Sequence, residues 1–128
     1  NFFVLGAYYA DPDYRERARE MLVAMQGSLQ RYPGQYSNWM HLALWLEAPF
    51  YEVVITGPEA LASLASLQGN YLPNALLAAS EAPMSGPLFE NRHSADATRF
   101  FICQFGQCRQ PVTGVAEALE ILEVGRKT

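Results

Sequence analysis

The chain lacks the features that mark several large classes of protein. Only two of its 128 residues are cysteines, too few for the disulfide framework of a small secreted domain. It contains no run of about 18 apolar residues, so we expect no membrane-spanning helix and no membrane partner. Its Lys and Arg residues form no basic tract and its net charge is −4, which argues against a nucleic-acid partner. The low cysteine content favours a cytoplasmic location.

What the chain has in abundance is hydrophobic residues. They make up 50% of the sequence and charged residues only 17%, which predicts a folded chain with a buried core. The opening residues, Asn1 to Leu5, show neither the charged region nor the small-residue cleavage site of a signal peptide. We therefore interpret the chain as a segment of a larger protein.

Residues 1–48 have the pattern of helices. Asp11 and Pro12 predict a helix start, because an Asp side chain accepts hydrogen bonds from free amides and Pro suits the first helical position. Apolar residues then recur every three or four positions as far as the Pro-Gly pair at 33–34. Residues 37–47 are apolar on nearly all sides, which predicts a helix buried between layers. The expected helices cover about residues 1–9, 12–32 and 37–47.

From Pro49 the pattern changes to short apolar runs. The first run, a helix signal and a second run together predict a βαβ unit with two parallel strands. The turn after the first run has one glycine and no lysine, which makes it a weak match to a phosphate-binding loop. The expected strands cover residues 51–56, 75–79 and 98–103, the expected helices 58–69 and 115–124, and a long loop 80–97.

The predicted fold is therefore α/β, with α+β as the alternative. A helical layer at residues 1–48 precedes a small α/β subdomain at residues 49–128. We expect the sheet of this subdomain to be mainly parallel and to be followed by a terminal helix.

Both cysteines lie in one short segment, where a strand-like run ends at Cys103 and Cys108 follows a turn that contains Gly106. A hairpin-like reversal would bring the two Cα atoms within disulfide range, whereas an extended path would separate them by more than about 15 Å. A reactive thiol also needs nearby cations, and Arg99 and Arg109 are the ones close in sequence. We expect two reduced, mainly structural cysteines that are neighbours and can be oxidised, with a redox role as the alternative.

We expect no metal site and no cofactor. Zinc would require His41 and His93 together with the two cysteines, but the histidines are scattered and the cysteine spacing is wider than a zinc knuckle. Asn38, Trp39 and His41 are weak candidates for substrate binding. Trp39 could stack on a sugar ring and His41 could act as a base, although core packing is the commoner use of such residues.

Six short motifs occur in a fixed order along the chain. They are DPDYRERA at 11–18, YSNW at 36–39, YEVVITG at 51–57, YLPN at 71–74, PLFENR at 87–92, and Cys103-x4-Cys108-x2-Pro111-Val112. This series resembles the carboxy-terminal region of the thioredoxin-domain-containing, six-hairpin-glycosidase-like family related to spermatogenesis-associated protein 20, whose activity is not established. The resemblance implies that residues 1–48 are the last hairpins of an (α/α) barrel and residues 49–128 a small tail. It also implies an upstream barrel and a thioredoxin-like domain as partners.

Three functions follow from these observations. The first is a structural or interaction fragment that completes the barrel, and the second is a redox dithiol made by the two cysteines. The third is part of a carbohydrate-active enzyme, but no complete active site is visible, and Glu47 and Glu52 are an unremarkable carboxylate pair. If neighbouring hairpins are missing, apolar side chains are exposed and the fragment is expected to form homodimers or aggregates. The candidates for this exposed surface are Phe2, Phe3, Trp39, Met40 and Trp45.

Overall fold

The computed structural model describes the backbone of residues 1–127 and the side chains of residues 1–123. Helices and strands fall close to the predicted ranges, and a short β4 and a 3-10 turn are added. The elements are α1 (Phe2–Tyr9), α2 (Pro12–Arg31), a 3-10 turn (Pro33–Gln35), α3 (Ser37–Glu47), β1 (Tyr51–Thr56), α4 (Ala60–Gln68), β2 (Ala75–Ser80), β3 (Arg99–Gln104), β4 (Gln107–Cys108) and α5 (Val115–Lys127). No helix within the described residues is long and apolar enough to cross a membrane.

The mixed α/β class and the βαβ unit are confirmed, but the sheet is not mainly parallel. Its strand order is β2-β1-β3-β4, and β1 pairs in parallel with β2 across α4. The β1–β3 and β3–β4 pairs are antiparallel. The reason is the loop between β2 and β3, which has no crossover helix. It leaves β2 after Ser80 and enters β3 at Arg99, at the same end of the sheet, so β3 must run back along β1.

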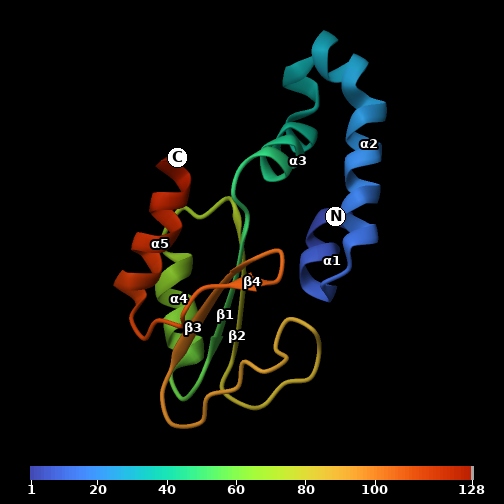
Figure 1. Ribbon diagram of the computed structural model, residues 1–128. Helices are drawn as coiled ribbons and strands as arrows, with labels where there is room; N and C mark the ends of the chain where they lie inside the picture. The colour runs from blue at the N-terminus through green and yellow to red at the C-terminus, as the bar shows by residue number, and fades with distance from the viewer. Residues whose placement is uncertain (128) are drawn as a thin grey trace.

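The sheet is the middle of three layers (Figure 1). β1 is buried at all six positions, which explains its continuous apolar run. Tyr51, Val53 and Ile55 face α4 and α5, where they pack with Leu67 and Leu122. On the other face, Val54 is covered by Leu88 and Phe89 of the 81–98 loop. Glu52 borders a cavity that α1 and the start of α2 also line.

The helices α1 to α3 form an arm that rises from the sheet (Figure 1). The predicted cap at the start of α2 is present, because the backbone N–H of Asp13 donates to Asp11 Oδ1 at 2.9 Å. The inner side of the arm packs around Phe3, Leu46 and Phe50. Phe3 is therefore buried, which corrects the expectation that it belongs to an exposed surface.

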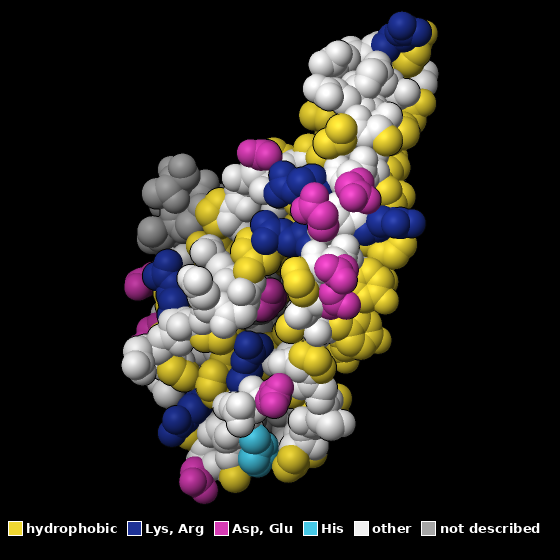
Figure 2. Space-filling view, turned by 45° about the vertical axis from the view of Figure 1, so that its right-hand side comes forward, with side chains coloured by type: hydrophobic (Ala, Val, Ile, Leu, Met, Phe, Trp, Pro, Cys, Tyr) yellow, Lys and Arg dark blue, Asp and Glu magenta, His cyan; other side chains and the backbone are white. Residues whose placement is uncertain are grey.

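The prediction that α3 is buried between layers is wrong. Leu46 is its one fully buried residue, whereas Met40 is exposed and Leu44 is 60% exposed. α3 packs against α2 on one side, and Trp45 packs on Phe3 and Phe50, which corrects the expectation that Trp45 belongs to the exposed surface. The exposed apolar side chains are those of Met40 and Leu44. Figure 2 shows hydrophobic side chains along one edge of the arm, beside a surface on which basic and acidic side chains are interspersed.

The turn between β1 and α4 is closed by the end of the 81–98 loop. The backbone N–H of Glu59, at the start of α4, donates to Thr98 Oγ1 at 2.9 Å. The N–H of Gly57 donates to the carbonyl of Ser80 at 3.3 Å. These amides are engaged within the protein, so the turn does not present them to a phosphate group.

Candidate functional site

The candidate site is built on the hairpin of β3 and β4. Its loop has two residues, Phe105 and Gly106, with φ of 49° and 81°. Many two-residue hairpin loops have a positive φ at both central residues, because the resulting turn matches the twist of the two strands that it joins. Gly adopts a positive φ freely, but Phe does so rarely. A bulky residue therefore sits in an unfavourable conformation at this turn.

This turn places Cys103 opposite Cys108 in the antiparallel pair, with their Cα atoms 3.9 Å apart, and the two form a disulfide. The prediction that the cysteines are neighbours is confirmed. The expectation of two thiols at rest is corrected, because the hairpin closes tightly enough to bond them. Cys103 is 1% exposed, whereas Cys108 faces solvent, so the two sulfur atoms differ in access.

A cation lies against the exposed sulfur. Nη2 of Arg92 donates to Cys108 Sγ at 3.4 Å, and Nη1 of the same guanidinium donates to the carbonyl of Leu88 at 2.7 Å. The second bond holds the guanidinium in place within the 81–98 loop. Sequence reasoning named Arg99 and Arg109 as the nearby cations and missed Arg92, because it lies 16 residues before Cys108 and reaches it only through the folded loop.

A buried carboxylate completes a row across the sheet. Glu52 of β1 pairs with Cys103 of β3, which pairs with Cys108 of β4, so the three side chains lie on one face. Glu52 is 5% exposed, and this burial raises the pKa of its carboxyl. Hydrogen bonds from the backbone N–H groups of Gly106 and Phe105, together with Arg92, act in the opposite direction. The sequence offered Glu52 only as a carboxylate near Glu47, whereas the structure pairs it with Cys103. A lone Glu within an apolar strand is the sequence signal for this position.

A second arginine covers the hairpin turn from the helical arm. The guanidinium carbon of Arg15, on α2, lies 3.3 Å from the centroid of the Phe105 ring. Its Nε is buried without a hydrogen-bond partner among the described residues, and burial lowers the pKa of this side chain. A cavity of about 350 Å³ lies between the arm, the 81–98 loop and the hairpin, and Glu52 and Arg92 also border it. The carboxyl group of Glu52 and two guanidinium groups therefore border one cavity, and Arg92 links it to the disulfide.

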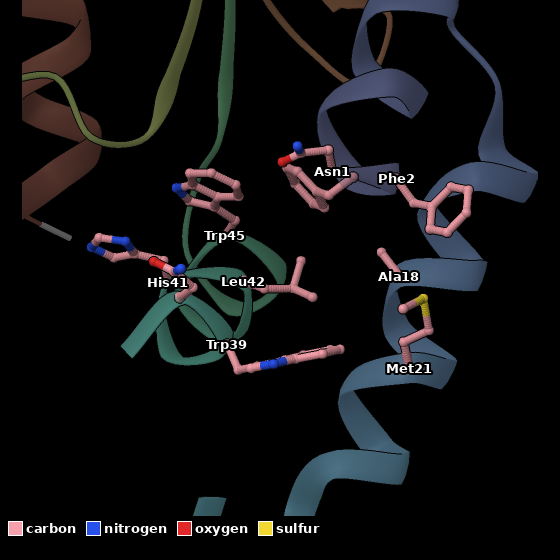
Figure 3. A pocket seen from close by; sticks show the side chains of 10 residues that line it. Asn1, Phe2, Ala18, Met21, Trp39, His41, Leu42 and Trp45 are labelled. Carbon is pink, nitrogen blue, oxygen red and sulfur yellow. The ribbon is translucent and has the colours of Figure 1, made fainter. Parts of the chain in front are cut away.

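The weak substrate-binding candidates lie elsewhere, at a second cavity of about 400 Å³ between α2 and α3. Asn38, Trp39 and His41 all border it, so the structure brings the three together. Figure 3 shows Trp39 pointing towards Met21 of α2, whereas His41 lies on the side away from α2. The His41 ring is parallel to the ring of Trp45 at a centroid distance of 6.3 Å.

This second cavity has the aromatic surface that a sugar ring would use, but its described lining contains no Asp or Glu. Hydrolysis of a glycosidic bond needs two carboxyl groups on either side of the substrate. The surface therefore lacks the acid and base of such an enzyme. Within the described residues there is also no group of three or more His, Cys, Asp and Glu side chains that could hold a metal ion.

Comparison with known proteins adds no assignment. No protein-family model matches the chain, no curated protein matches it, and no solved structure matches it.

Proposed function

We propose that this chain is a thiol–disulfide exchange element, in which Cys103 and Cys108 cycle between disulfide and dithiol. The observation that carries the proposal is the Arg92 guanidinium on the exposed sulfur of Cys108. A neighbouring cation stabilises a thiolate and attracts an anionic thiolate that approaches the disulfide. Cys108 is therefore the sulfur at which exchange begins.

The reaction proceeds in two displacements. A thiolate of a partner dithiol attacks Cys108 Sγ, forms a mixed disulfide with it and breaks the bond to Cys103, which leaves as a thiolate and is protonated. The second thiolate of the partner then attacks the partner's own sulfur in the mixed disulfide, and Cys108 leaves as a thiolate, which takes up a proton from solvent. The partner ends as a disulfide and this chain as two thiols, with two electrons transferred.

One further observation favours exchange over a purely structural disulfide. Phe105 holds a positive φ in the turn that joins the cysteines, and such strained residues cluster at functional sites. We also propose a cytoplasmic location, where disulfides are usually transient, catalytic or redox-sensing. The family resemblance supplies a candidate partner of the right chemistry, the upstream thioredoxin-like domain of the full-length protein.

A redox titration tests the proposal. In glutathione buffers we expect the Cys103–Cys108 bond to be reduced reversibly at a potential of about −270 to −180 mV, the range of exchange proteins. Thiol alkylation after acid quenching, followed by mass spectrometry, measures the reduced fraction. A potential below about −300 mV is that of a structural disulfide and would contradict the proposal.

The role of Arg92 is tested by a matched pair of variants. We expect Arg92→Ala to slow attack by glutathione about five-fold at low salt, because an exposed charge at contact distance contributes about 1 kcal/mol. Arg109→Ala removes a cation next to Cys108 in sequence and should leave the rate unchanged. Equal effects of the two variants would show that net charge, rather than the Arg92 contact, sets the rate.

As a second candidate, we propose that the arm serves as an interaction surface, which the exposure of Met40 and Leu44 on α3 favours. In the full-length protein this surface would contact the upstream barrel. For the isolated chain we expect homodimers that Leu44→Glu converts to monomers, measured by light scattering at high concentration. Ser37→Glu, also on α3 and exposed, is the control and should still dimerise. A strictly monomeric wild-type chain would refute this candidate.

A further inference from the structure

We infer that Glu52 donates the proton that Cys103 takes up when the disulfide opens, and recovers that proton when the disulfide forms again. This role rests on the proposed exchange reaction and concerns Cys103, the buried cysteine of the pair. It distinguishes Glu52 from Arg92, which acts on the exposed sulfur.

The need for a proton donor follows from the burial of Cys103. When an incoming thiolate attacks Cys108, the electron pair of the broken bond stays on Cys103 Sγ. Cys103 is 1% exposed, so water cannot solvate the new charge, and Arg92 lies on Cys108. A buried thiolate without a partner is unfavourable, and it becomes a neutral thiol once a neighbouring acid donates to it.

Glu52 is placed to be that acid. It is directly opposite Cys103 in the β1–β3 pair, and directly paired residues of an antiparallel ladder have Cβ atoms about 4.5–5.5 Å apart. The other charged groups around the carboxyl are Arg92 and Arg15, with Asp11 on the border of the same cavity. Neither Arg side chain loses its proton in the physiological pH range, so neither can serve as the acid. The Asp11 carboxylate accepts the backbone N–H of Asp13 as the cap of α2.

The protonation state of Glu52 also suits this task. Burial raises the pKa of the carboxyl, which keeps the acid form available at a higher pH than for an exposed Glu. The proton passes from Glu52 to Cys103 Sγ, which leaves a carboxylate and a neutral thiol. The carboxylate is then held by hydrogen bonds from Gly106 and Phe105 and by the nearby Arg92. The adjacent cavity of about 350 Å³ has room for water that returns the proton.

The test is the pH dependence of disulfide reduction by dithiothreitol, with each rate constant divided by the thiolate fraction of the reagent. For the wild-type chain we expect the corrected rate to fall as rising pH ionises Glu52. Glu52→Gln keeps an oxygen for the turn amides but has no acid proton. We expect this variant to show a flat profile, about 100-fold slower than wild type at the acid end.

Two further variants separate proton transfer from structural support. Glu90→Gln removes an exposed carboxylate of the same loop as Arg92 and should reproduce the wild-type profile. Glu52→Asp retains a carboxyl group, so its reduction rate should be lower but should keep the wild-type pH dependence. If Glu52→Gln does not fold, this variant replaces it in the test. A Glu52→Gln rate that is reduced equally at every pH, or a profile like that of wild type, would overturn the inference.

A second measurement does not depend on exchange. In a Cys108→Ser chain, the Cys103 thiol can be titrated by the ultraviolet absorbance of its thiolate. Adding Glu52→Gln should lower the pKa of Cys103, because it removes a neighbouring negative charge. An unchanged pKa would refute the proximity of the two groups. A failed glutathione titration refutes the exchange function separately, since this thiol titration would still report on Glu52.

Discussion

Phe100→Ala is expected to lower the free energy of unfolding by about 3–5 kcal/mol, the range for removing a buried aromatic side chain. Phe100 is 1% exposed and belongs to the core between the sheet and the α4–α5 layer. Its backbone also exchanges two hydrogen bonds with Val112, at 2.8 and 3.1 Å, so the cavity would open beneath the segment that leads into α5. Surrounding β-sheet backbone cannot collapse into the space, which leaves most of the lost contacts unreplaced.

Urea unfolding followed by circular dichroism measures this loss. Leu61→Ala is the matched control, since Leu61 lies on the exposed side of α4 and its truncation should change stability by no more than about 0.5 kcal/mol. A Phe100→Ala chain as stable as the Leu61→Ala chain would show that this layer of the core is not formed as described.

Gly57→Ala is expected to destabilise the chain by about 2–6 kcal/mol, for two separate reasons. The φ of Gly57 is 124°, a conformation that costs a residue with a Cβ about 1–3 kcal/mol. A Cβ at this position would also lie 2.6 Å from the carbonyl oxygen of Ala97 and 2.6 Å from the Cα of Thr98. Both are backbone atoms, so relief requires movement of the loop that closes the α4 start, at a further cost of about 1–3 kcal/mol.

The control for this variant is Gly27→Ala. Gly27 lies within α2, and a Cβ there meets nothing within 4 Å. This substitution should raise stability by about 0.5–1 kcal/mol, because alanine loses less backbone entropy on helix formation than glycine. If Gly57→Ala unfolded at the same urea concentration as wild type, the close approach of the loop to the β1–α4 turn would be refuted.

The sequence alone determined the elements whose signals are local. The start of α2 was predictable, because Asp11 and Pro12 act on the nearest amides and on their own backbone angles. The strand at 51–56 was predictable because a run of apolar and β-branched residues suits a fully buried strand. The order of strand, helix and strand then implied the parallel β1–β2 pair.

Tertiary structure decided the features that depend on the path of the 81–98 loop and on how the layers pack together. The direction of β3 follows from a loop that has no crossover helix. The exposure of α3 follows from which other layers pack against it. The site depends on the same kind of information. Glu52 meets Cys103 through strand register, and Arg92 meets Cys108 through the fold of a long loop. Register and loop path are set by the packing of the whole chain, so no spacing within one segment could place a carboxylate and a guanidinium beside the disulfide.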